Sequence, residues 1–276
     1  MRYEVIHLKD HFAFLGEDGK DPVLELFLPY NMTEMHRENQ KRPCMFVCPG
    51  GGYGMVSQRE SEPIGVHFLP EGYNVFVLTY TCAPSRFPTQ LREVAAAMEL
   101  IHRNADAWNC DVSRIAIMGF SAGGHLAAHY STAYDCAGVR EVFPDSKPVQ
   151  ASVLCYPVIT ADARYANRGT YVNLLGHFPE TQAEIDAFSC EKLVSDHTPP
   201  AFLWHTAEDS VVPVMNTYLY AAALAEHHIP CEVHVYPYGP HGLATVDDQT
   251  CGALPEKEAY AAAWLDAVKK WLKLIF

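Results

Sequence analysis

Residues 115–125, I-A-I-M-G-F-S-A-G-G-H, constrain the fold of this chain more than any other stretch. An apolar run typical of a buried strand ends at Gly119, Ser121 follows at a turn, and residues typical of a buried helix come next. Gly119 and Gly123 flank the serine in the pattern G-x-S-x-G, where larger side chains would collide with the packed strand and helix. We therefore predict a strand, a sharp turn with Ser121 at its apex, and a helix.

A serine at such an apex presents its hydroxyl beyond the end of the sheet, where a substrate can reach it. The backbone N–H of Ala122 would then face an oxyanion that forms beside Ser121. The five-residue pattern alone is a weak signal, because glycine and serine are common in loops. The strand before it and the helix after it make a nucleophilic serine the favoured interpretation.

Strand-like apolar runs alternate with helix-like segments from residue 45 to the end of the sequence. Two opening strands are expected at 5–7 and 23–28, and later ones at 45–48, 74–80, 115–119, 151–156, 201–205 and 231–236. Helices are expected at 63–70, 88–108, 214–227 and 259–276. This alternation is typical of the α/β class, with a mostly parallel sheet covered by helices on both faces.

No repeat, low-complexity tract or boundary divides the 276 residues, so we expect a single domain over 1–276. The segment from about 160 to 200 has no clear periodicity. We expect it to form a small lid or wall over the site.

Three consecutive glycines, Gly50, Gly51 and Gly52, follow directly after the predicted strand at 45–48. Glycine is entropically costly at such a place, so a flexible linker is the less favoured explanation. The favoured one is a loop whose bare N–H groups approach a ligand closely. We predict that the N–H groups of Gly51 and Gly52 join that of Ala122 in an oxyanion hole.

Asp209 and His241 lie on loops that follow the last two predicted strands. The carboxyl ends of parallel strands meet at one edge of a sheet, which is where ligands bind in such folds. Their order in the chain is nucleophile, acid and base, as in hydrolases with a nucleophile elbow. We predict that His241 accepts the Ser121 proton and that Asp209 orients the imidazole.

Each of these residues also has a plainer explanation. The G-P-H-G sequence around His241 is often an ordinary turn, and an aspartate in the place of Asp209 is often a helix N-cap. Glu208 is the rival acid. The conjunction of all three residues in the right order favours the catalytic interpretation.

Charge and cysteine usage limit the partners and the compartment. The 33 acidic against 20 basic side chains give a net charge of −13, which argues against nucleic acid or an anionic membrane surface as partner. The amino terminus lacks an apolar core of signal-peptide length, and the nine scattered cysteines contain no C-x-x-C pair. We expect reduced thiols and a cytoplasmic location. The oligomeric state stays open, a homo-oligomer included.

His125 and His129 stand four residues apart on the helix predicted after Ser121, a spacing at which two histidines can bind one metal ion. No carboxylate or third ligand accompanies them, so packing in the core is the favoured explanation. We expect neither a metal nor a cofactor.

Several motifs together resemble the α/β-hydrolase superfamily. They are P-G-G-G-Y at 49–53, S-Q-R-E-S-E-P at 57–63, G-F-S-A-G-G-H at 119–125, D-x-x-V-P at 209–213 and P-H-G-L at 240–243. More narrowly they are similar to its small acetyl esterases, xylan esterases and hemicellulase-type enzymes. Pro49 departs from the histidine that hormone-sensitive-lipase-like esterases carry before the three glycines, and their helical cap has no counterpart here. The resemblance therefore implies the acetyl-esterase branch and a site open to small acyl groups.

From these features we expect a cofactor-free serine hydrolase of short-chain carboxylic esters, with acetyl esters of sugars or xylo-oligosaccharides as substrates. A formamidase or small peptidase would use the same machinery and differ only in the leaving group. A binding protein on a hydrolase scaffold is the alternative from another class, since fold alone does not give function.

Overall fold

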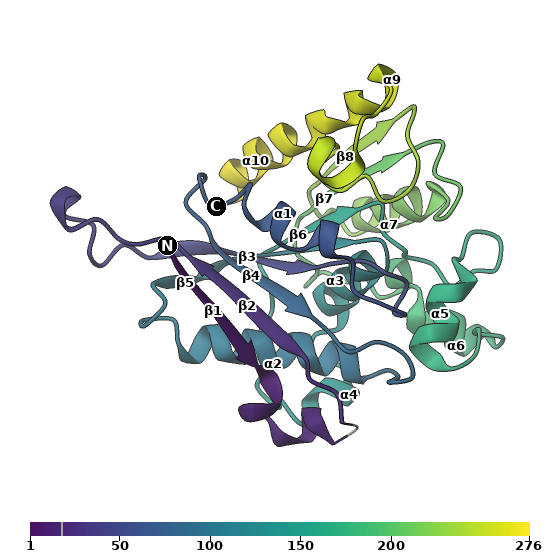
Figure 1. Cartoon of the computed structure of the whole chain (residues 1–276). Coiled ribbons are helices and arrows are strands. Elements are labelled where there is room, and N and C mark those ends of the chain that lie inside the picture. The colour runs from purple at the N-terminus through teal and green to yellow at the C-terminus, as the bar shows by residue number, and fades with distance from the viewer. Residues whose placement is uncertain (18) are drawn as a thin grey trace.

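A computed structural model describes residues 1–17 and 19–276 of the chain, and its centre is one eight-stranded sheet (Figure 1). The strands are β1 (Arg2–His7), β2 (Val23–Leu28), β3 (Arg42–Cys48), β4 (Asn74–Thr79), β5 (Cys110–Phe120), β6 (Ala151–Cys155), β7 (Ala201–Thr206) and β8 (Cys231–Tyr236). They lie in the order β1-β2-β4-β3-β5-β6-β7-β8. β2 is antiparallel to both β1 and β4, and the other neighbouring strands are parallel. The prediction of a mostly parallel sheet is confirmed.

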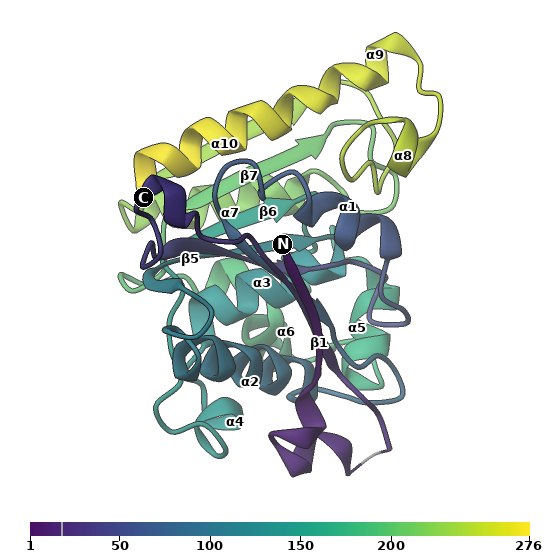
Figure 2. The ribbon, with the colours of Figure 1, turned by 60° about the vertical axis from the view of Figure 1, so that its left-hand side comes forward.

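Helices cover both faces of the sheet, as Figure 2 shows. On one face lie α2 (Thr89–Arg103), α3 (Ala122–Ala133) and α7 (Met215–Glu226), and on the other lie α1 (Glu62–Gly65) and α10 (Ala263–Ile275). Side chains alternate along β3, so that Phe46 joins the first of these cores while Met45 and Val47 join the second. The remaining α-helices are α4 (Ala137–Arg140), α5 (Arg168–Leu175), α6 (Gln182–Phe188), α8 (Asp248–Cys251) and α9 (Glu256–Ala259).

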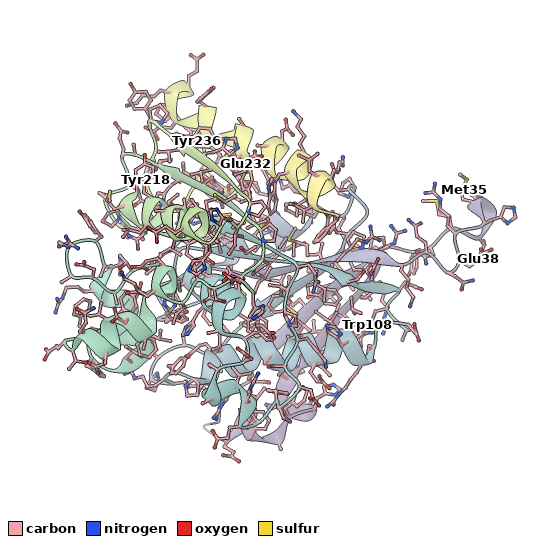
Figure 3. All side chains as sticks on the ribbon, turned by 180° about the vertical axis from the view of Figure 1, so that it is seen from behind. Met35, Glu38, Trp108, Tyr218, Glu232 and Tyr236 are labelled. Carbon is pink, nitrogen blue, oxygen red and sulfur yellow. The ribbon has the colours of Figure 1, made fainter. Side chains whose placement is uncertain are left out.

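The segment between β2 and β3 includes the short 3-10 helix η3 (Thr33–Met35) and extends away from the sheet. Figure 3 shows Met35 and Glu38 at its tip, while Trp108 lies in the body of the molecule. Within residues 1–17 and 19–276, no helix combines the length and the apolar character needed to cross a bilayer.

Two segments differ from expectation. The helix predicted at 63–70 is wrong in length, since α1 ends at Gly65 and residues 66–72 continue as turns. The amides of His67 and Phe68 bond to the carbonyls three residues earlier, which is tighter than an α-helix. The segment at 160–200, which showed no periodicity, contains α5 and α6.

The turn at Ser121 has the predicted geometry. Ser121 lies directly between β5 and α3. Its φ is +53°, a backbone conformation that residues other than glycine rarely adopt. A Cβ atom at Gly119 would overlap the carbonyl oxygen of Gly123, and one at Gly123 would overlap the carbonyl oxygen of Cys48 on β3. Only glycine lets strand and helix approach this closely.

We expect Gly123→Ala to lower the free energy of unfolding by more than about 2 kcal/mol, because backbone atoms of β3 would have to move. Gly169→Ala on α5 is the matched control, since the nearest atom to its Cβ would be Asn167 Oδ1 at 3.5 Å. Because alanine favours helix more than glycine does, Gly169→Ala should leave the free energy of unfolding unchanged or raise it by up to about 1 kcal/mol. Urea unfolding of both variants measures the difference, and equal stabilities would contradict the close-packing account.

Candidate active site

Ser121, His241 and Asp209 lie together at the carboxyl ends of β5, β8 and β7. Ser121 Oγ is 2.8 Å from His241 Nε2, and His241 Nδ1 is 2.6 Å from Asp209 Oδ2. The structure thus brings the three predicted side chains into one continuous chain of hydrogen bonds. In this arrangement the imidazole can take the serine proton while the carboxylate fixes its tautomer.

Asp209 is buried, and four groups donate hydrogen bonds to its carboxylate. The amides of Val211 and Val212 donate to Oδ1, both at 2.9 Å, and the imidazoles of His241 and His205 face Oδ2. Burial alone would raise the pKa of Asp209, but the hydrogen bonds from His205 and His241 outweigh it and hold the pKa well below its ordinary value. Asp209 therefore stays ionised, as a partner of an imidazolium must.

The structure excludes Asp209 as the N-cap of α7 and Glu208 as the acid that contacts His241. α7 begins at Met215 with Val214 as its N-cap residue, so Asp209 does not cap it. Glu208 approaches the amide of Gly239 at 3.4 Å, and His241 Nδ1 is bonded to Asp209 instead. Asp209 is therefore the acid that contacts the histidine.

His205 was not predicted from the sequence as a site residue, but its imidazole is hydrogen-bonded to the Asp209 carboxylate. It is fully buried, and its Nε2 lies 3.1 Å from Asp209 Oδ2 and 3.0 Å from the carbonyl oxygen of Val212. Both partners are acceptors, so the proton is assigned to Nε2, and Nδ1 accepts from the hydroxyl of Thr217 at 2.8 Å. The signal in the sequence was a polar residue at the end of an apolar strand, four positions before Asp209.

The glycine loop and the turn at Ser121 line one side of the same cavity, whose volume is about 220 Å³. Gly51 and Gly52 have φ values of +123° and +64°, and both line the cavity together with Ser121. Among the described residues no acceptor takes the N–H of Gly51 or Gly52. Ala122 is the first residue of α3, so its N–H has no acceptor one turn earlier in the helix. These three donors are the groups predicted for an oxyanion hole.

A buried carboxylate that sequence reasoning missed, Glu60, connects the glycine loop to the loop of His241. Glu60 is only 3% exposed, and its Oε2 accepts from the amide of Gly50 at 2.8 Å. Its Oε1 accepts from the hydroxyl of Tyr156 at 2.7 Å, and the same hydroxyl accepts from the amide of Ala244 at 3.0 Å. The Tyr156 ring also packs against His241, with 5.0 Å between ring centroids. Glu60 therefore couples the positions of the two loops.

The segment at 160–200 forms part of the cavity wall through α5. Asn167 and Thr170 line the cavity, and Asn173 donates from Nδ2 to the carbonyl oxygen of Gly52 at 2.9 Å. From the other side, the hydroxyl of Tyr80 donates to the carbonyl oxygen of Pro49 at 2.7 Å. The glycine loop is thus held from both flanks.

His125 and His129 belong to α3 and pack in the core. His125 Nδ1 is 3.0 Å from the hydroxyl of Tyr53, its Nε2 is 3.1 Å from the carbonyl of Phe188, and His129 stacks on Phe87. Burial lowers the pKa of His125 to about 4 and that of His129 to about 3, so both stay neutral. Within residues 1–17 and 19–276, no group of three or more histidine, cysteine or acidic side chains is arranged to hold a metal.

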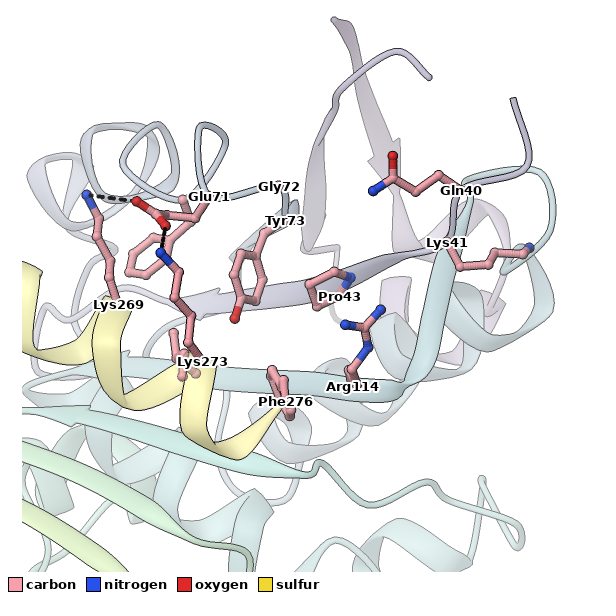
Figure 4. A pocket seen from close by; sticks show the side chains of 12 residues that line it. Gln40, Lys41, Pro43, Glu71, Gly72, Tyr73, Arg114, Lys269, Lys273 and Phe276 are labelled. Carbon is pink, nitrogen blue, oxygen red and sulfur yellow. Dashed lines mark ion pairs between the residues drawn. The ribbon is translucent and has the colours of Figure 1, made fainter. Parts of the chain in front are cut away.

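A second cavity, of about 300 Å³, lies at the opposite ends of the strands, near the start of β3 and the end of α10 (Figure 4). Its basic side chains are already paired with acids. Glu71 lies between Lys269 and Lys273, at 4.0 and 2.8 Å, and Arg114 pairs with Asp111 at 2.7 Å. It contains no serine or histidine, so the candidate active site is the cavity at Ser121.

Comparison with known proteins supplies the family. The model of the BD-FAE family matches residues 31–224, a stretch that contains Ser121, Asp209 and the glycine loop. The chain belongs to the BD-FAE family. This agrees with the resemblance to small acetyl and xylan esterases that the motifs indicated.

Two curated relatives of this BD-FAE chain are named for xylan chemistry. It is 39% identical to endo-1,4-beta-xylanase B of Butyrivibrio fibrisolvens over 81% of this chain and 36% of that protein. It is 31% identical to an acetylxylan esterase of Xylanibacter ruminicola over 83% of this chain and 45% of that protein. The chain thus spans less than half the length of these two relatives.

The crystal structure of an acetyl ester-xyloside bifunctional hydrolase from Caldicellulosiruptor lactoaceticus is similar along almost the whole chain. The two share 33% identity with a TM-score of 0.85, over 99% of this chain and 97% of the other. The α/β-hydrolase fold predicted from the sequence is confirmed, and the chain is homologous to carboxylic ester hydrolases.

We expect Glu60→Gln to lower kcat for p-nitrophenyl acetate about 10- to 100-fold. Glutamine keeps one acceptor, so its amide group would face either the amide of Gly50 or the hydroxyl of Tyr156 and displace a loop. The same change at exposed Glu226 on α7 removes an equal charge and serves as the control. Steady-state kinetics with a circular dichroism check of folding measures the effect. A Glu60 variant as active as the Glu226 variant would contradict the coupling role.

Proposed function

We propose that this domain is a serine carboxylesterase that removes short acyl groups through an acyl-enzyme on Ser121. The observation that carries the proposal is the continuous chain from Asp209 through His241 to Ser121. Beside it lie three backbone N–H groups that have no acceptor within residues 1–17 and 19–276. The catalytic roles follow from what each group can do. Binding proteins on hydrolase scaffolds normally lack one of these side chains, and all three are in place here.

The proposed reaction has two halves. The Ser121 hydroxyl attacks the ester carbonyl while His241 Nε2 takes its proton, and the N–H groups of Gly51, Gly52 and Ala122 stabilise the oxyanion. His241 then gives the proton to the leaving alcohol, which leaves the acyl group on Ser121. Water, deprotonated by His241, attacks the acyl carbonyl. The bond between the acyl carbon and Ser121 Oγ then breaks, His241 returns the proton to Oγ, and the acid is released. Throughout, Asp209 stabilises the imidazolium.

For the substrate we propose acetyl esters of sugars or xylo-oligosaccharides. The cavity of about 220 Å³ beside Ser121 suits a small acyl group. The names of the relatives, an acetylxylan esterase and an acetyl ester-xyloside hydrolase, support an acetylated carbohydrate. No observation in the structure favours a formamide or a peptide over an ester. The nine cysteines, all free and most of them buried, support the proposal of a reducing, cytoplasmic compartment.

We expect the wild-type protein to release acetate from acetylated xylo-oligosaccharides and Ser121→Ala to release none above background. Ser131→Ala, on the helix α3 that follows Ser121, is the matched control, because within the described residues its hydroxyl bonds only to the carbonyl oxygen of Ala127. Enzymatic quantification of acetate measures the reaction. A wild-type protein that cleaves p-nitrophenyl acetate through Ser121 but not the acetylated sugars would keep the mechanism and contradict the substrate.

A further inference from the structure

Arg59 stands at the mouth of the candidate active site, on the short 3-10 helix η4 (Gln58–Glu60). It lines the cavity of about 220 Å³ together with Ser121 and His241, and it also lines a neighbouring cavity of about 620 Å³. Of the described residues that line the cavity at Ser121, Arg59 and His241 are the only ones with basic side chains. Arg59 therefore lies where the two cavities meet.

The guanidinium of Arg59 is held against the loop of His241. A Cβ atom on Gly242, the residue after His241, would lie 2.6 Å from Arg59 Nη2 and 3.3 Å from its Cζ. Gly242 has φ +80°, and its missing side chain makes room for the guanidinium. The charged group thus sits against the residue that follows His241, although the side chain as a whole is exposed.

Of the described residues, three acids line the two cavities together with Arg59, and none of them forms an ion pair with it. Arg59 forms no ion pair or side-chain hydrogen bond with residues 1–17 or 19–276. Both oxygens of the adjacent Glu60 accept hydrogen bonds, from the amide of Gly50 and the hydroxyl of Tyr156. In the larger cavity, Glu25 accepts from the hydroxyl of Tyr3, and Glu62 is exposed to solvent. Arginine cannot lose its proton in a protein, so five donors remain available at the mouth of the site.

We propose that Arg59 binds a carboxylate on the alcohol part of the ester substrate, as in an acetylated oligosaccharide that carries a uronic acid. This inference rests on the proposed esterase function. The planar guanidinium matches a carboxylate with two parallel hydrogen bonds, which a neutral sugar hydroxyl cannot form. The smaller cavity suits the acyl group, so the carboxylate would lie beside Arg59 where the two cavities meet.

The negative net charge of the protein increases the effect that a single cation at the site has on the binding of an anionic substrate. A net charge of −13 repels an anionic substrate from most of the surface. An unpaired arginine at the mouth offsets that repulsion at the place where the ester must enter. Water screens the exposed guanidinium, so we expect a moderate preference of about five- to tenfold.

Two matched acetyl esters test the inference, phenyl acetate and its 3-carboxyphenyl analogue. We expect Arg59→Gln to lower the ratio of kcat/KM for the charged ester to kcat/KM for the neutral one about five- to tenfold, mainly through KM. Arg59→Lys should restore part of the ratio. The ratio in the wild type should also fall as the salt concentration rises.

Arg37→Gln is the matched control. Arg37 lies on the segment between β2 and β3 that extends away from the sheet, and its loss changes the net charge by the same amount. It should leave the ratio unchanged. A ratio unaffected by Arg59→Gln, including an equal loss on both esters, would overturn the carboxylate site and leave the esterase function standing. Failure of the wild type to hydrolyse either ester would instead overturn the esterase function, and this inference with it.

Discussion

The site depends on the direct packing of backbone against backbone where β5 turns into α3. Gly123 brings the first turn of α3 against the carbonyl groups of Cys48 and Pro49, so the end of β3 and the start of the helix share one surface. That contact places the glycine loop beside Ser121 and holds Ser121 itself at φ +53°. The strain at Ser121 is thus maintained by this close packing of the helix against the end of β3.

Two buried carboxylates then fix the loops that this packing brings together. Asp209 accepts hydrogen bonds from the amides of Val211 and Val212 and from two imidazoles. Glu60 accepts from the amide of Gly50 and the hydroxyl of Tyr156. A buried charge is costly unless its acceptors are filled, so each loop must keep its position for the carboxylate to be satisfied. The three loops of the site therefore form one interdependent unit instead of three separate ones.

The sequence predicted the parts of the fold that local pattern encodes. Apolar runs located the strands from β3 to β8, and the glycines around Ser121 located the turn, because sterics at those positions admit little else. The helices α5 and α6 were not predicted, since they are short and lack a long apolar stripe. The capping box of Thr181 and Glu184 was the one signal for α6. The role of Glu60 could not be foreseen, because its partner Tyr156 is 96 residues away.

The most direct test of this account is to incubate the folded protein with a fluorophosphonate and map the modified residue by peptide mass spectrometry. Activation of Ser121 by His241 predicts a single adduct on Ser121 and a strong loss of labelling in His241→Ala. A protein that hydrolyses p-nitrophenyl acetate yet carries no adduct on Ser121 would contradict the assignment of Ser121 as the nucleophile.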